Sequence, residues 1–130
     1  MRARTGVLLV AGLVAAACGD AVVTEVPAGR WGGQNIELQV EGDGAKVLFK
    51  CGASGTLVGR LELNGSGHFV ADGTYTPLLI NTGPRPAHYE GSISGDGMTL
   101  AVTTSGAGSV EIGEFQLHYR AAGSFEVCNF

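Results

Sequence analysis

Basic residues are scarce in this chain. Its 130 residues include eight Lys and Arg against twelve Asp and Glu, and charged residues make up only 15% of the total. Nucleic-acid binding needs clustered Lys and Arg that neutralise phosphates. Beyond residue 17 the six basic residues are instead scattered: Arg30, Lys46, Lys50, Arg60, Arg85 and Arg120. We therefore expect no nucleic-acid partner.

The chain also lacks long apolar runs. Even the apolar run at its N-terminus is short. Residues 6–17 are all apolar or small, and they follow Arg2 and Arg4. These twelve residues are too few for a transmembrane helix, which needs about 20. A basic start followed by a short apolar run is typical of an export signal. We therefore predict that residues 1–17 form a signal peptide that is removed.

Cysteine is rare, with three residues in all. The segment Leu13–Gly19, in which small residues precede Cys18, resembles a bacterial lipobox. The resemblance implies that Cys18 carries lipid, becomes the new N-terminus and holds the protein to a membrane of the bacterial envelope. Typical lipoboxes carry Leu at the position of Ala15, and Ala15-x-Ala17 also suits ordinary signal peptidase, which would release a soluble protein. Both alternatives stay open at this point.

A lipid on Cys18 leaves Cys51 and Cys128 as an even pair. Exported proteins enter compartments in which disulfides persist, and an odd free thiol is unfavourable there. We therefore predict a Cys51–Cys128 disulfide.

Glycine, by contrast, is abundant, with 22 residues. Gly, Asn and Asp tolerate the positive φ that tight turns require, and clusters of them recur at 41–44, 52–55, 64–67, 94–97, 105–108 and 121–123. Between these turns apolar residues alternate with period two, as in strands with one buried face. No segment carries a helical stripe of apolar residues. The pattern therefore predicts an all-β protein.

The alternation predicts eight strands in one domain over residues 30–130, preceded by a tether over residues 18–29. The strands are expected at 31–40, 45–51, 56–63, 68–75, 87–93, 98–104, 109–119 and 124–129. Their inward side chains are Ile36, Leu38, Val40, Val47, Phe49, Leu57, Leu61, Leu63, Phe69, Ala71, Tyr75, Tyr89, Ile93, Met98, Leu100, Val102, Phe115, Leu117, Phe125 and Val127. Short connections favour an antiparallel up-and-down β-barrel, which removes exposed edges, with a β-sandwich as the alternative.

The predicted disulfide agrees with this topology. The second and eighth strands run in the same direction in a meander, so Cys51 and Cys128 at their ends would meet at one rim, next to Trp31. Trp31 is out of phase with the rest of its strand, which a bulge at Gly32–Gly33 would correct. Cys128 is out of phase as well, so the last strand must bulge or end just before it.

Gly29-Arg30-Trp31 resembles the GxW motif of lipocalins and other calycins, whose barrels also have eight strands in meander order. The chain further carries Trp31-Gly32-Gly33, Phe49-Lys50-Cys51, Gly73-Thr74-Tyr75, Met98-Thr99-Leu100 and a terminal Cys128. This set of motifs, which spans about residues 29–129, is similar to that of small uncharacterised bacterial lipoproteins. The resemblances imply a calycin-like barrel and an envelope location, and they imply no activity.

No motif for catalysis, metal binding or cofactor binding is present. The GxSxG, phosphate-loop and EF-hand patterns are missing, and the three histidines are not spaced like metal ligands. Most ionisable side chains have outward parity, among them His68, Asp72, His88, Glu90, Glu111 and His118. We therefore expect no enzyme, no metal and no cofactor. His88, Glu90 and Asp72 gathered in a cleft would instead indicate a hydrolase.

The barrel interior is one candidate for ligand binding. Tyr89 is its expected polar group, and four glycines have inward parity: Gly59, Gly73, Gly91 and Gly113. These glycines either leave room for a small apolar ligand or let a narrow barrel fill with side chains. We favour the filled core.

The long connection 76–86 is the second candidate. It contains Leu78, Leu79 and Ile80, and long connections in compact domains are often functional. These side chains either plug the Trp31 end of the barrel or form an apolar patch that faces a partner.

These observations favour a monomeric, membrane-anchored envelope lipoprotein of the non-enzymatic type that binds a small apolar ligand or an envelope protein. An inhibitor is the alternative, by analogy with the lipoprotein inhibitors of c-type lysozyme, which are also small disulfide-bearing barrels. The analogy rests on Phe49-Lys50-Cys51 before a glycine turn. The Ser-Gly-x-Lys-type segment with which those inhibitors meet the enzyme has no clear counterpart here.

Overall fold

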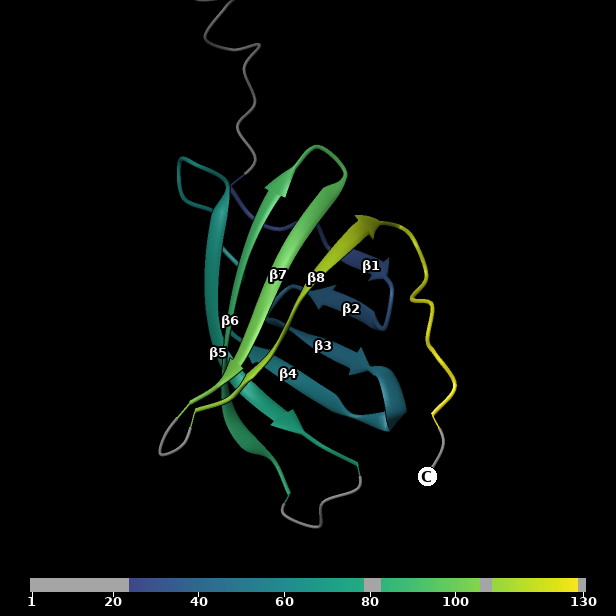
Figure 1. Ribbon diagram of the computed structural model, residues 1–130. Coiled ribbons are helices and arrows are strands. Elements are labelled where there is room, and N and C mark those ends of the chain that lie inside the picture. The colour runs from purple at the N-terminus through teal and green to yellow at the C-terminus, as the bar shows by residue number, and fades with distance from the viewer. Residues whose placement is uncertain (1–23, 79–82, 106–108, 129–130) are drawn as a thin grey trace, which may run out of the picture.

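Eight antiparallel strands close into a barrel in the computed structural model, which describes residues 24–78, 83–105 and 109–128. Each strand pairs with the next along the chain, and β8 pairs with β1 (Figure 1). The strands are β1 (Gly29–Gly33), β2 (Ile36–Glu41), β3 (Gly44–Phe49), β4 (Ser54–Val58), β5 (His68–Thr76), β6 (Arg85–Ser94), β7 (Gly97–Thr104) and β8 (Glu111–Tyr119). The predicted up-and-down barrel is confirmed, and the β1–β8 pairing rules out the sandwich.

The barrel has two distinct ends. One, which we call the disulfide end, carries the β1–β2 turn, the β3–β4 connection with Cys51, and the connections from β5 to β6 and from β7 to β8. The other, which we call the N-terminal end, carries the remaining three connections and residues 24–28. Strands β5–β8 are longer than β1–β4, so the barrel wall that they form extends further than the wall formed by β1–β4 (Figure 1).

Inward side chains fill the middle of the barrel. In β2, β3 and β7 alternate residues are buried, as the period-two pattern predicts. The largest fully buried side chains are Trp31, Tyr89, Ile36, Leu38, Met98, Leu100, Leu117, Val47 and Val102. The ring of Phe69 occupies the space that Gly91 leaves, since a Cβ atom at Gly91 would overlap it. The filled core that the sequence favours is therefore present in the described residues.

The continuous first strand predicted over 31–40 is wrong, because this segment is the hairpin of β1 and β2. Gly33 pairs with Ile36, and Asn35 in the turn between them has φ 65°. Asn is one of the few residues that tolerate this left-handed conformation. A turn, rather than the predicted bulge at Gly32–Gly33, therefore accounts for the change of phase.

The last strand predicted over 124–129 is also wrong for the residues described. After β8 the chain forms an extended tail that crosses the β1–β2 hairpin on the outside of the barrel (Figure 1). The Asn35 N–H donates to the Ser124 carbonyl at 2.6 Å. Phe125 and Val127, predicted to face inward, are 40% and 91% exposed. The barrel still has eight strands because the first predicted strand supplies two of them.

The predicted Cys51–Cys128 disulfide is present, and it ties the tail to the β3–β4 connection. The two Cα atoms lie 5.5 Å apart, and Cys51 belongs to a single 3-10 turn, η1 (Lys50–Gly52). The expected position next to Trp31 is wrong. The Trp31 indole N–H donates to the Pro27 carbonyl at 3.0 Å, toward the N-terminal end, whereas the disulfide lies at the opposite end.

A short pairing closes the N-terminal end. Glu25 forms an antiparallel bridge with Glu62, and the Val26 N–H donates to the Leu61 carbonyl at 2.9 Å. The Val26 and Leu61 side chains are buried. The described part of the predicted tether 18–29 is therefore packed onto the barrel.

Candidate functional site

A pocket of about 240 Å³ opens at the disulfide end of the barrel, and we call it the mouth pocket. It is lined by Asn35, Phe49, Lys50, Tyr75, Ile112, Gly113 and Phe115. These residues come from the β1–β2 turn, the end of β3 and the residue after it, the end of β5 and the first half of β8. The mouth pocket therefore lies opposite the end that Val26 and Leu61 close.

Three aromatic rings form the apolar wall of the mouth pocket. The ring centroid of Phe49 lies 5.2 Å from that of Tyr75, edge to face, and 5.7 Å from that of Phe115. Phe49 is buried, while Tyr75 and Phe115 are half-buried and face the opening. Aromatic pairs in such arrangements stabilise one another beyond their burial. The wall is therefore preformed.

The polar rim of the mouth pocket is held by the C-terminal tail. The Asn35 side-chain amide donates to the Glu126 carboxylate at 2.9 Å, and the Glu126 N–H donates to the Asn35 side-chain oxygen at 3.0 Å. The Asn35 hydrogen bond and the charge of Lys50 lower the pKa of Glu126. Cys128 fixes the same tail to Cys51, which follows Lys50. The disulfide and the mouth pocket thus form one structural unit.

Two residues predicted to contact a ligand, Trp31 and Tyr89, lie in the core of the barrel. Both are fully buried, and neither lines the mouth pocket. The Tyr89 hydroxyl donates to the Thr74 carbonyl at 2.6 Å, and burial raises the pKa of that hydroxyl. Tyr89 therefore satisfies its own hydrogen bond inside the core.

The predicted contact residue Leu78 lies at the disulfide end. It is exposed, and its Cδ2 would lie 2.7 Å from a Cβ atom placed on Gly52. The prediction that this connection plugs the Trp31 end is therefore wrong for Leu78. Leu79 and Ile80 lie outside the described residues.

The sequence predicts the inward direction of Phe49, Tyr75 and Phe115, and it does not predict that they gather at one end. Two of them do carry a positional signal. Phe49 stands just before the glycine cluster 52–55, and Tyr75 stands just before the long connection 76–86. In a meander the ends of these two strands lie at the same rim of the barrel, so the sequence could have placed Phe49 and Tyr75 at one end.

His88 joins two carboxylates on the outer surface of the barrel. Its Nδ1 lies 3.2 Å from Asp72 Oδ1 across the strand pair, and its Nε2 lies 3.2 Å from Glu90 Oε1. The hydrogen bond to Asp72, reinforced by Glu90, raises the pKa of His88 above its ordinary 6.5 against the opposing effect of partial burial. The three residues do come together, but the side chains of Asp72 and Glu90 are 92% and 62% exposed.

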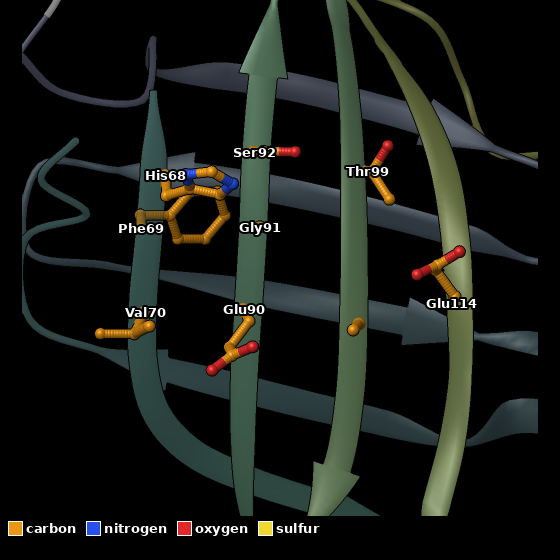
Figure 2. A pocket seen from close by; sticks show the side chains of 9 residues that line it. His68, Phe69, Val70, Glu90, Gly91, Ser92, Thr99 and Glu114 are labelled. Atoms are coloured by element: carbon orange, nitrogen blue, oxygen red, sulfur yellow. The ribbon is translucent and has the colours of Figure 1, made fainter. Parts of the chain in front are cut away.

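Beside this cluster the outer surface is hollowed, over about 290 Å³. We call this feature the outer hollow, and Figure 2 shows it across β5–β8. Its lining is His68, Phe69, Val70, Glu90, Gly91, Ser92, Thr99, Ala101 and Glu114. The short side chains of Ser92, Thr99 and Ala101 form the floor, because longer neighbours stand on both sides.

No group of three or more His, Cys, Asp or Glu side chains is placed to hold a metal ion in the described part of the chain. Nor does that part include a helix with the length and apolar character of a membrane span.

Fold and pocket together define the class of the protein: a closed, eight-stranded antiparallel barrel with a filled core and an aromatic pocket at one end. No protein-family model, curated protein or solved structure matches the chain.

Proposed function

We propose that the protein is a lipid-anchored binding module of the bacterial envelope, which takes the apolar end of a small ligand into the mouth pocket. The observation that carries the proposal is the gathering of Phe49, Tyr75 and Phe115 at one end of the barrel. Small-molecule sites are concave and mostly apolar, with a few polar groups that orient the ligand. The mouth pocket has this composition, with Asn35 and Lys50 at its rim.

The size of the mouth pocket restricts the ligand. Its volume of about 240 Å³ is below the range of about 300–1,000 Å³ found for pockets that enclose a drug-sized molecule. Among the described residues, the fully buried side chains of Tyr89 and Leu100 occupy the barrel interior. A ring or a short alkyl chain therefore enters, while the remainder of the ligand stays outside.

The anchor in this proposal is Cys18, which lies outside the described residues. It is supported by the export signal predicted over residues 1–17 and by the lipobox resemblance of Leu13–Gly19. Thr24 lies at the N-terminal end of the barrel, six residues after Cys18, and six residues span at most about 20 Å. The proposed lipid therefore holds the N-terminal end near the membrane, and the mouth pocket faces away from it.

Ligand binding is tested with the uncharged fluorophore N-phenyl-1-naphthylamine, whose emission rises in apolar surroundings. We expect saturable enhancement with the wild-type protein. Ile112→Asp is expected to weaken binding by about tenfold or more, because it places a carboxylate in the apolar wall. Ile112 is half-buried and lines the mouth pocket.

Val110→Asp is the matched control, since Val110 is 51% exposed, lies two residues away and does not line the pocket. Its affinity is expected to equal that of the wild type. Circular dichroism and thermal unfolding verify that both variants keep the fold. Absent enhancement with the wild type, or equal loss in the two variants, contradicts the proposed pocket.

The anchor is tested by the intact mass of protein extracted from its native membrane. We expect a chain that begins at Cys18 and carries acyl groups, with a mass lowered further by the two hydrogens lost in the disulfide. A Cys18→Ala variant is the control and is expected to leave the membrane fraction. An unacylated mass for membrane-free wild-type protein contradicts the anchor and supports ordinary signal-peptidase cleavage.

A further inference from the structure

Charge is distributed unevenly around the barrel. In residues 29–58, which include β1–β4, three basic residues balance three acidic ones. Strands β5–β8 carry one basic residue, Arg85, and four acidic ones, which are Asp72, Glu90, Glu111 and Glu114. All five side chains are exposed. The outer face of β5–β8 is therefore acidic, while the rest of the barrel wall is close to neutral.

The outer hollow lies in this acidic face, and the strand register explains its shape. Val70 pairs with Glu90, Glu90 with Ala101, and Ala101 with Glu114, so that these four residues form one row across β5–β8. Neighbouring strands lie about 4.8 Å apart. The backbones of Glu90 and Glu114, which Figure 2 labels, are therefore separated by about 10 Å. The residue between them in the row is Ala101, whose side chain is a methyl group.

Each part of this row matches one part of a long basic side chain. Val70 is 63% exposed and offers an apolar contact for the alkyl stem of a Lys or Arg, which prefers such surfaces. The two carboxylates flank the floor at Ala101, where an ammonium or guanidinium group can contact both. Within the described residues Glu114 forms no ion pair, and the Glu90 carboxylate contacts the His88 ring, with 3.2 Å between Glu90 Oε1 and His88 Nε2.

We propose that the outer hollow is a docking surface for a basic segment of a partner protein, with one Lys or Arg side chain seated over Ala101 between Glu90 and Glu114. The proposal does not depend on the mouth pocket, which lies at the disulfide end and is lined by other residues. Charge complementarity selects the partner: an acidic face raises the local concentration of basic segments and repels acidic ones.

The experiment is a titration of the ¹⁵N-labelled protein with a short Arg-Gly repeat peptide at low ionic strength, with an Asp-Gly repeat peptide for comparison. We expect the Arg-Gly peptide to shift the amides of Glu90, Ala101 and Glu114, and the Asp-Gly peptide to shift none of them. Added salt is expected to weaken binding because it screens exposed charges.

Three variants distinguish the binding of a basic side chain in the outer hollow from non-specific attraction to the net charge of the protein. Glu114→Gln is expected to weaken binding by about two- to fivefold, the range of one exposed ion pair. Ala101→Leu keeps the charge, fills the floor, and is expected to weaken binding further. Glu41→Gln, an exposed acid at the end of β2, is the control and is expected to have no effect.

pH provides an independent readout. His88 faces Asp72 from β5, Glu90 on its own strand and Thr103 from β7. Its protonation adds a positive charge beside Glu90, which lines the outer hollow. Binding of the Arg-Gly peptide is therefore expected to weaken as the pH falls from about 8 to about 5.5.

Several results overturn the proposal. Equal effects of Glu41→Gln and Glu114→Gln would mean that net charge alone attracts the peptide. Shifts confined to the mouth pocket would place the peptide elsewhere. Absent peptide binding, together with shifts of the Ala101 amide that depend on protein concentration, would assign the face to a second copy of this chain.

Discussion

Removal of the Cys51–Cys128 disulfide is expected to lower the free energy of unfolding by about 4–5 kcal/mol. The two cysteines are separated by 77 positions in the chain, and a crosslink that closes so long a loop restricts the unfolded chain strongly. Small domains are stable by only about 5–15 kcal/mol in total. Without the crosslink the barrel therefore loses a large share of its stability.

The loss is expected to concentrate where the tail lies. β1 has only five residues and pairs with β8 at Trp31, Gly32 and Gly33. The tail crosses the β1–β2 hairpin and bonds to it through Ser124 and Glu126. The disulfide holds the end of this tail in place, so it reinforces β1, which is one of the two shortest strands of the barrel. Long strands such as β6, with ten residues, depend on it less.

The measurement compares urea unfolding of the Cys51→Ser/Cys128→Ser variant with the parent protein, with Cys18→Ser in both so that no third thiol can exchange. Reduced parent protein is the control and should unfold at the same urea concentration as the double variant. Amide exchange should accelerate first in the tail and at Asn35. A loss below about 1 kcal/mol contradicts the chain-entropy argument.

The strands in the middle of the chain could be predicted from the sequence, because the period-two alternation and the glycine clusters of the turns agree there. The alternation predicts strands at 68–75, 87–93 and 98–104, and β5, β6 and β7 begin and end within two residues of these limits. The glycine clusters at 64–67, 94–97 and 105–108 mark turns before, between and after these strands. Where period two and turn chemistry agree, the local sequence is enough to define a strand.

The two ends of the domain were not accessible in the same way. The β1–β2 turn contains no glycine between its paired ends, and Asn35 supplies the positive φ. The tail alternates like a strand through Phe125 and Val127, yet it lies outside the barrel. The out-of-phase positions of Trp31 and Cys128 were the only signs in the sequence, and a bulge explains such signs as well as a turn does.

The candidate sites depend on register, which the sequence does not fix. Parity places Phe49 and Tyr75 on the inner face and His88 and Asp72 on the outer face, as the structure confirms. Only the pairing of β5 with β6 sets Asp72 opposite His88. Likewise, the rings meet at the disulfide end only because β3, β5 and β8 are staggered as observed. A shift of register would separate them.

Gly33→Ala is expected to destabilise the protein by about 3 kcal/mol, because it overcrowds the contact between the paired strands β1 and β8. A Cβ atom at Gly33 would overlap the carbonyl oxygen of Gln116 in β8. A backbone atom in a paired strand cannot rotate away as a side chain would, so β1 and β8 must separate. The φ of Gly33 is not positive, which makes the effect steric and independent of backbone conformation.

Gly42→Ala is the matched control for this substitution, because a Cβ atom there would meet nothing within 4 Å and its φ is not positive either. Its free energy of unfolding should stay within about 0.5 kcal/mol of the wild type. Urea unfolding of both variants, with amide exchange across β1 and β8, measures the difference. Equal stabilities would show that β1 and β8 can separate at no cost in free energy. The tail would then hold the β1–β2 hairpin to the barrel without a contribution from the β1–β8 pairing.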